Sequence, residues 1–391
     1  MVKVVVLKET AEGEHRVAIV PESVPRLVKC GVEMLIQERA GAAAGFRQEA
    51  YEKAGATIVS DYDHLIAEGD LFLKVNCVCL QDGMMQIVDP FPPQSIIVGF
   101  FNPFKNIQNV KELAAKNMTC FSMELVPRIS RAQRMDALSA MSSAAGYKAV
   151  LVGASSLNKF FPLMMTAAGT ISPSKILIIG AGVAGLQAIA TARRLGAQVK
   201  AFDTRPVVKE QVESLGAEFI ELEISDGAET AGGYAAEMSE DFYRHEQAVI
   251  AEHIEDADVV VTTAQIFGKR APLLITSEMV ESMRPGAVIV DIAAENGGNC
   301  ELTVPGQTVD RHGIIIHGAT DLPSSLSYHT SEMFSRNVTA LIVEMIKDGE
   351  ITIDMNDEVM ATTLLTHGGK IVNSHVQELL DWKKEQEGNT L

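Results

Sequence analysis

Residues 128–141, RISRAQRMDALSAM, gather hydrogen-bonding side chains within an apolar-rich chain. The guanidinium, amide, carboxylate and hydroxyl groups of Arg128, Gln133, Asp136 and Ser139 suit gripping a carboxamide and a ribose. The segment offers no His, Lys, Tyr or Cys to move a proton, so it favours orienting a reactant over protonating it. A run of this kind at a helix start is also typical of a capping and solvated face. Asp136 and Ser139 lie one helical turn apart and share a face in either interpretation.

A glycine loop follows about forty residues later, where KILIIG runs into the sequence from Gly180 to Gly185. In such a G-x-G-x-x-G loop Gly180 permits a tight turn and Gly182 lets a pyrophosphate approach the backbone. Gly185 lets the following helix pack closely on the strand, and the N-terminus of that helix favours phosphate charge. Asp203 ends the next strand, 18 residues after Gly185. This context predicts a dinucleotide site, and the alternative is an ordinary glycine-rich turn between strand and helix.

Asp203 also bears on which dinucleotide is bound. A carboxylate at this position accepts hydrogen bonds from the ribose hydroxyls and repels a 2′-phosphate, which predicts NAD(H) over NADP(H). Arg205 lies two residues further on, and an Arg can accommodate that phosphate. We therefore expect NAD(H), with NADP(H) left as the alternative.

The elements that must position these residues follow an α/β pattern. Short β-branched runs alternate with amphipathic helical windows, which is typical of parallel sheets covered by helices. We expect strands at 3–7, 32–37, 71–75, 95–101, 175–180, 218–222, 258–264, 287–293 and 313–319. We expect helices at 22–31, 63–69, 139–157 and 325–349. The predicted fold is therefore two Rossmann-like, doubly wound parallel-sheet domains joined by long helices.

The domain boundaries are placed at the two long helices. The first domain is predicted to be discontinuous and to comprise residues 1–138 and 327–391, and the dinucleotide-binding Rossmann domain to comprise residues 139–326. The polar tail, 381–391, is expected to fray.

Composition narrows the class of protein. With 391 residues, of which 47% are hydrophobic and 21% charged, the chain reads as a soluble globular protein. Its net charge of −18 disfavours nucleic acid and adsorption to anionic membranes, although the charge is also compatible with a role in solubility alone. No run approaches the roughly 20 apolar residues of a membrane helix, so direct membrane insertion is not expected.

Cysteine and histidine usage predicts no metal site. The five cysteines are scattered and odd in number, which favours a reducing compartment over a disulfide scaffold. Cys77 and Cys79 have no second pair beside them, and the nine His residues show no metal-ligand spacing.

Long collinear blocks carry a family resemblance. They include EHRVAIVPE, RAQRMDALSAM, GAGVAGLQAIATARRLGAQVKAFDTR, AETAGGYAAEMSEDF and MRPGAVIVDIAAENGGNCELT. These blocks closely resemble the NAD(H)-binding component of proton-translocating nicotinamide nucleotide transhydrogenase, which is related to alanine dehydrogenase. The resemblance implies a homodimeric, peripheral subunit on the cytoplasmic side of the inner membrane. It also implies docking to an NADP(H)-binding component attached to a membrane-spanning part. Either a separate bacterial subunit or a piece of a longer chain fits this pattern.

The resemblance also implies roles for individual residues. It places Arg128, Gln133, Asp136 and Ser139 in a catalytic nicotinamide pocket. It implies cofactor-binding roles for a second set, namely Arg131, Gly180, Gly182, Val183, Gly185, Asp203, Arg205, Gly233, Tyr234, Gln247 and Ile266. Residues 228–242 correspond to a mobile loop whose tip is Tyr234, although the same residues could form an inert surface loop.

The implied reaction explains the missing proton donor. Reduction of a keto acid or an imine requires a positioned donor, whereas hydride transfer from NADH to NADP⁺, here coupled to proton translocation, joins two redox cofactors and requires none. QSIIVGFFNPF, where an alanine dehydrogenase would carry its catalytic His, has none. Arg16 and Lys74 resemble the substrate-binding residues of that enzyme and could be relics or structural ion pairs, and His15 is the one His worth testing as an acid. The alternatives are a free-standing NAD-dependent alanine dehydrogenase and a non-catalytic NAD-binding module.

Overall fold

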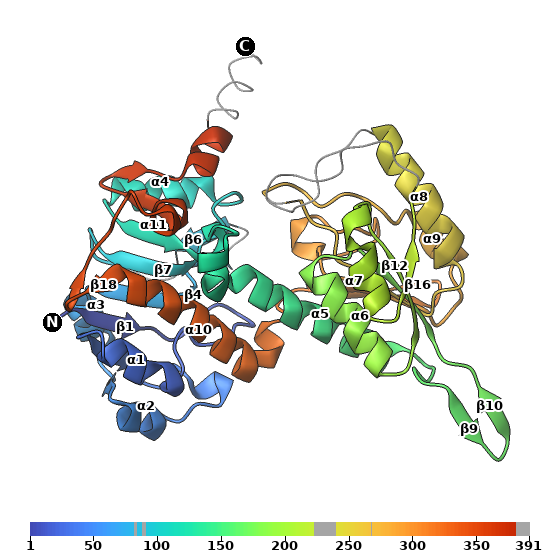
Figure 1. Ribbon diagram of the computed structural model, residues 1–391, viewed down its shortest axis with the longest axis horizontal. Helices are drawn as coiled ribbons and strands as arrows, with labels where there is room; N and C mark the ends of the chain where they lie inside the picture. Colours follow the sequence, from blue (N-terminus) through green and yellow to red (C-terminus); the bar gives the residue numbers. More distant parts are fainter. Residues whose placement is uncertain (82–83, 88–90, 223–239, 267, 381–391) are drawn as a thin grey trace, which may run out of the picture. The chain divides into compact units, whose positions relative to one another are not determined.

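The structure is a computed structural model in which residues 1–391 are described except for 82–83, 88–90, 223–239, 267 and 381–391 (Figure 1). The chain divides into two compact units. Unit 1 comprises Met1–Met141 and Ser324–Leu391, and unit 2 comprises Ser142–Pro323. The domain boundaries inferred from sequence, at 138/139 and 326/327, stay a prediction about folding domains. The expectations of a fraying tail and of a mobile loop with its tip at Tyr234 lie outside the described residues.

Unit 1 is built on an eight-stranded sheet in the order β21-β20-β8-β7-β4-β1-β2-β3. Its strands are β1 (Lys3–Val6), β2 (Glu33–Gln37), β3 (Thr57–Val59), β4 (Leu71–Asn76), β7 (Ile96–Phe100), β8 (Thr119–Ser122), β20 (Leu364–His367) and β21 (Lys370–Ile371). The strands from β3 to β8 are parallel, whereas β20 and β21 extend the sheet in antiparallel pairs. The four strands predicted in this part of the chain are confirmed, and the antiparallel edge was not predicted.

Helices cover the sheet of unit 1. They are α1 (Val24–Val28), α2 (Gln48–Ala54), α3 (Tyr62–Glu68), α4 (Ile107–Ala115), α10 (Ser327–Met345) and α11 (Glu358–Thr363). Val4 and Val6 point to the same side of β1 and share one buried core with Leu341 and Met345 of α10. The predicted helix 325–349 is too long because Asp348 and Gly349 both have positive φ. They form the two-residue turn between β18 (Ile346–Lys347) and β19 (Glu350–Ile351).

Unit 2 contains a seven-stranded sheet in the order β13-β12-β11-β14-β15-β17-β16. Its strands are β11 (Lys175–Ile179), β12 (Gln198–Phe202), β13 (Glu218–Ile220), β14 (Val259–Thr262), β15 (Val288–Asp291), β16 (Thr308–Arg311) and β17 (Ile314–Gly318). All pairs are parallel except β16 with β17. In both units the parallel strands run outward in both directions from the first strand, which is the doubly wound order. The predicted fold class is therefore confirmed, with antiparallel edges added.

Both faces of the unit 2 sheet are buried. Ile176 and Ile178 of β11 lie in one core with α5 (Ala137–Ser156), α6 (Val183–Arg194) and α7 (Lys209–Ser214). Leu177 and Ile179 lie in another with α8 (Glu240–Ile254) and α9 (Ser277–Ser282). Burial on both faces explains why these strands read as continuous apolar runs in the sequence.

Helix α5 is rich in small residues because its neighbours in unit 2 approach closely. A Cβ atom built on Gly146 would lie 2.0 Å from the carbonyl oxygen of Ala184 in α6. A Cβ atom on Gly153 would lie 2.7 Å from a methyl group of Val259 in β14. The prediction of a closely packed helix from its Ala, Ser and Gly content is thus confirmed.

Two hairpins stand outside the large sheets. One is β5 (Val78–Gln81) with β6 (Met84–Ile87), and the other is β9 (Met164–Thr166) with β10 (Gly169–Ile171). Figure 1 shows β9 and β10 projecting from unit 2. Within the described ranges, no helix has the length and apolar character needed to cross a membrane.

Asp291 organises the loop that follows β15. Its carboxylate is fully buried and accepts five hydrogen bonds. The donors are the hydroxyls of Thr262 and Thr303, at 2.9 and 2.8 Å, and the backbone N–H groups of Ala293, Asn299 and Cys300, at 2.9, 2.8 and 3.1 Å. One side chain therefore fixes both the end of β14 and the loop beyond β15.

We predict that Asp291→Ala lowers the free energy of unfolding by at least about 3 kcal/mol, because several buried donors lose their acceptor. Urea denaturation followed by circular dichroism measures this loss. Asp310→Ala is the matched control, since Asp310 accepts the N–H of Gly313 at an exposed turn and its loss should cost less than about 1 kcal/mol. Equal losses in the two variants would contradict the role assigned to Asp291.

Candidate functional site

The glycine loop begins with a turn that requires glycine at its first position. Gly180 follows β11 with a φ of +95°, and its N–H donates to the carbonyl of Phe202 at 2.8 Å. A Cβ atom there would lie 2.6 Å from the hydroxyl oxygen of Thr263. That hydroxyl donates in turn to the carbonyl of Gly180 at 3.1 Å. The turn is thus held from both neighbouring strands.

The other two glycines of the loop play different parts. A Cβ atom on Gly185 would lie 1.8 Å from the carbonyl oxygen of Gly180, so the helix has no room for a side chain at this contact. A Cβ atom on Gly182 would face open space, with Nη2 of Arg205 as its nearest neighbour at 4.0 Å. Gly182 caps α6 without any side-chain hydrogen bond, and Val183 begins the helix partly exposed. Open space before the uncapped N–H groups of this helix fits a pyrophosphate.

Asp203 binds the loop from the end of β12. Its carboxylate is 8% exposed and accepts the N–H of Ala181 at 2.7 Å. Arg205 gives it three further bonds, each 2.9 Å long, from its backbone N–H, Nε and Nη2. The two residues predicted at the adenosine end therefore form one bidentate ion pair beside Gly182.

This arrangement stands at the topological switch point of unit 2. Strand β11 lies between β12 and β14, and the chain leaves it in opposite directions on its two sides. Ligands of doubly wound sheets bind in the crevice beyond the carboxyl ends of the strands at this point. Ile266 lies half-buried in the loop after β14, at the same edge of the sheet. Gln247 of α8 donates from Nε2 to the carbonyl of Leu273 at 2.8 Å.

The polar stretch lies in unit 1, before and within the first turn of α5. Arg128 is exposed in a loop, and Gln133 is exposed in a 3-10 helix, Ser130–Met135. Asp136 accepts the backbone N–H of Ser139 at 2.8 Å and its hydroxyl at 2.6 Å, so this carboxylate caps α5. The capping interpretation is thereby confirmed, and a role in ligand binding stays a prediction.

Arg131 connects the polar stretch to the rest of unit 1. Its guanidinium lies 2.7 Å from Asp357, which caps α11, and 3.5 Å from Glu344 of α10. Arg134 is held as well, because its carbonyl accepts Nδ2 of Asn337 at 2.9 Å. The structure thus brings Arg128, Gln133, Asp136 and Ser139 together in unit 1. It places the glycine loop, Asp203 and Arg205 in unit 2, and Gly233 and Tyr234 fall outside the described residues.

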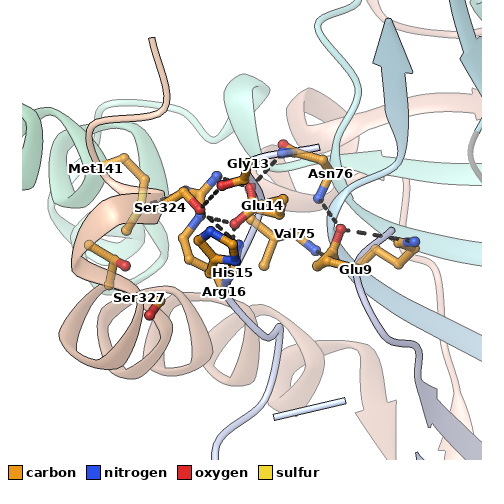
Figure 2. Close-up of polar contacts among 12 residues, drawn as sticks. Glu9, Gly13, Glu14, His15, Arg16, Val75, Asn76, Met141, Ser324 and Ser327 are labelled. Carbon is orange, nitrogen blue, oxygen red and sulfur yellow. Dashed lines mark hydrogen bonds and ion pairs between the residues drawn. The ribbon is translucent and has the colours of Figure 1, made fainter. Parts of the chain in front are cut away.

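A buried ionic network occupies unit 1 around Arg16 (Figure 2). Arg16 is 7% exposed and pairs with Glu14 through Nε at 2.8 Å and Nη2 at 2.5 Å. Its Nη1 contacts the sulfur of Met141 at 3.0 Å, and Asn76 donates to Glu14 at 2.7 Å. The positive charge of Arg16 is therefore neutralised inside the unit by a bidentate partner.

Lys74 lies in a second part of the network. It is fully buried, and its Nζ lies 3.3 Å from the carbonyl of Lys8 and 3.9 Å from Glu9. Burial raises the pKa of Glu9 to about 7, although Lys74 opposes the shift. His15 is exposed, and its backbone N–H donates to the hydroxyl of Ser324 at 2.8 Å. Of the two interpretations of Arg16 and Lys74, the structure provides the ion pairs.

Sequence reasoning missed three polar residues of unit 2. Thr263 and Asp291 sit at or just after strand ends, and strand-end polar residues facing a glycine loop are a signal that could have found them. Glu246 is buried on α8, where it interrupts apolar residues at helical spacing. Within the described part of the chain, no group of three or more His, Cys, Asp or Glu is placed to hold a metal ion.

Known proteins match the chain over nearly its whole length. The alanine dehydrogenase/PNT N-terminal domain matches residues 5–145, and the C-terminal domain of the same family matches residues 149–374. The first of the proteins that make up NAD(P) transhydrogenase subunit alpha in Rickettsia prowazekii is 43% identical over 96% of this chain and 97% of its own length. The protein of the same name from Rhodospirillum rubrum is 43% identical over 95% of this chain and 98% of its own.

The solved structures agree. The crystal structure of transhydrogenase from Sinorhizobium meliloti superposes with a TM-score of 0.84 at 38% identity, over 95% of this chain and 100% of that one. The resemblance carried by the sequence blocks is thereby confirmed, and the chain belongs to the alanine dehydrogenase/PNT family.

Proposed function

We propose that this chain binds NAD(H) in unit 2 and passes hydride from NADH directly to NADP⁺ held by a partner subunit. In this proposal a membrane-spanning transhydrogenase subunit couples the transfer to proton translocation. The chain then acts as a peripheral subunit on the cytoplasmic side of the inner membrane. Relatives that are 43% identical carry the name of a transhydrogenase alpha subunit, which supports the assignment.

The observation that carries the proposal is the glycine loop at the switch point, with Asp203 bonded to it. Gly182 leaves room for a pyrophosphate before the N-terminus of α6, and Asp203 stands where the ribose of a dinucleotide lies in such folds. A dinucleotide supplies the redox chemistry through its nicotinamide ring. The residues of the chain bind it, orient the ring and exclude water.

The proposed nicotinamide pocket draws on Arg128, Gln133, Asp136 and Ser139. These side chains can hold a carboxamide and a ribose, and hydride transfer between two nicotinamide rings asks for no proton from them. Asp136 and Ser139 are already fixed to each other at the first turn of α5, which provides a rigid base for Gln133 and Arg128 nearby. Rigid positioning is the main contribution a protein can make to such a step.

The runner-up, a free-standing alanine dehydrogenase, needs groups that hold and protonate a small substrate. Arg16 and Lys74 are its candidates, but Glu14 neutralises Arg16 and Lys74 is fully buried near Glu9. This internal pairing favours transhydrogenation. A non-catalytic NAD-binding module would share the glycine loop but not the dependence of hydride transfer on the polar stretch.

We further propose that the chain works as a homodimer through the hairpin β9–β10. Leu163 and Met165 are 53% and 79% exposed at this hairpin, and Phe160 just before it is 55% exposed. An isolated two-stranded hairpin is marginally stable in water, and clustered exposed apolar side chains mark interaction surfaces. A second copy of the chain would cover both defects at once.

We predict that NADH deuterated at both C4 positions, bound to this chain, transfers deuterium to NADP⁺ on an NADP(H)-binding transhydrogenase component. Mass spectrometry of the NADPH formed should show the label retained, because direct transfer does not exchange with water. Normal NADH binding with unlabelled or absent NADPH would refute the proposed reaction. Reduction of NAD⁺ by alanine without a partner would establish the runner-up instead.

We predict that Gln133→Asn slows this transfer about 10-fold, because shortening an orienting side chain misplaces the ring. Stopped-flow mixing gives the rate, and NADH titration and thermal denaturation should remain close to those of the unmodified chain because Gln133 is exposed. Gln211→Asn on α7, also exposed, is the control. An unchanged transfer rate in Gln133→Asn would favour the other assignments for the polar stretch.

We predict that Met165→Asp converts the dimer to monomer at micromolar concentration, since a charge cannot be buried unpaired in an apolar interface. Sedimentation velocity measures the state. Met355→Asp, at an exposed apolar residue of unit 1, should leave the dimer intact. A monomeric unmodified chain, or a dimeric Met165→Asp variant, would exclude the hairpin as the dimer contact.

A further inference from the structure

Helix α8 carries an acid within its buried apolar face. Ile250 and Ile254 are 1% and 0% exposed and share a core with Phe202 at the end of β12. Glu246 lies one helical turn before Ile250, on the same face, and is 5% exposed. The buried face of α8 thus ends in a carboxyl group, directly beyond the residue that precedes Asp203 in the chain.

Glu246 makes no hydrogen bond or ion pair with any residue that the structure describes. A buried carboxyl group without a partner is costly, so its retention calls for a reason other than stability. Burial, and next the charge of Asp203, raise the pKa of Glu246 to about 8. Near neutrality the group therefore carries a proton and can donate one hydrogen bond while accepting others.

Asp203 has no such spare capacity. A carboxylate offers about four acceptor positions, and Asp203 uses four, for the N–H of Ala181 and for three donors of Arg205. A ribose hydroxyl could bind Asp203 only after Arg205 released one of them. The neighbouring carboxyl of Glu246 can accept or donate without displacing a described contact.

We propose that Glu246 is a specificity-determining residue of the dinucleotide site, whose carboxyl hydrogen-bonds the 2′-hydroxyl of the adenosine ribose of NAD(H). The inference rests on the proposed function, because it assumes that unit 2 holds the dinucleotide with its ribose near Asp203. NADP(H) carries a phosphate on that hydroxyl, so it cannot make this bond and brings further negative charge toward Asp203. Glu246 thereby adds to the preference for NAD(H).

Two variants separate this role from a structural one. Glu246→Leu completes the apolar face and removes all hydrogen bonding, whereas Glu246→Gln keeps a donor and an acceptor in nearly the same shape. Isothermal titration of NADH and NADPH gives the two dissociation constants for each variant. We expect Glu246→Leu to weaken NADH about 10-fold, to lower the preference for NADH over NADPH by the same factor, and to melt no earlier than the unmodified chain. Glu246→Gln should retain most of the affinity for NADH.

A 2′-deoxyadenosine analogue of NADH tests the contact without any mutation. The unmodified chain should bind it about 10-fold more weakly than NADH, and Glu246→Leu should bind the two equally. Glu252→Leu, at an exposed acid of the same helix, is the control and should change neither affinity.

The outcomes distinguish the two levels of the argument. If the unmodified chain fails to bind NADH, the proposed function fails. If it binds NADH but also binds the deoxy analogue equally well, the role of Glu246 is overturned while the proposed function stands. That second measurement decides the question even if Glu246→Leu does not fold. Unchanged affinities in a folded Glu246→Leu variant would overturn the role as well.

Discussion

The arrangement of unit 2 depends on one contact between backbone atoms, where Gly185 in the first turn of α6 meets the carbonyl of Gly180. A Cβ atom at Gly185 would lie 1.8 Å from that oxygen, so any other residue would drive the helix away from β11. Because the helix stays close, its N-terminus faces the crevice beyond the strands, and the N–H of Ala181 comes within reach of Asp203. The phosphate-binding and ribose-binding ends of a dinucleotide site are thus set by the same few ångströms of backbone.

Carboxylates at neighbouring strand ends then divide the work according to how fully they are bonded. Asp291 accepts five hydrogen bonds and holds loops, which leaves it no role in binding. Asp203 is saturated by the glycine loop and by Arg205, which can exchange partners. Glu246 is buried without a described partner. A gradient from saturated to unpaired carboxyl groups leads from the frame of the unit to the group best able to read a ligand.

The parts of this structure that local rules govern could be predicted from the sequence. The strands of both sheets, the Asp203 turn and the tight packing of α5 follow from periodicity and from small-residue content, because these depend on neighbours close along the chain. The long helix was overextended because the Asp348–Gly349 turn was overlooked. The antiparallel strands β20 and β21 escaped because they pair with a strand more than two hundred residues away. Glu246 and Thr263 were missed since their significance arises only when α8 and β14 meet the glycine loop, and the ligand-binding roles of the polar stretch stay predictions.

The two charged residues retained from an amino-acid-binding pattern fit the same logic. A guanidinium that grips a substrate must be free to exchange its partner, but Arg16 is 7% exposed and held by both oxygens of Glu14. Breaking a buried pair of this kind costs several kcal/mol, which a small carboxylate would have to recover on binding. Lys74 faces a similar cost, since leaving Glu9 and the Lys8 carbonyl would strand a buried ammonium group. Unit 1 therefore uses these charges to hold its own loops together, and chemistry that needs no proton from them is the chemistry it can best support.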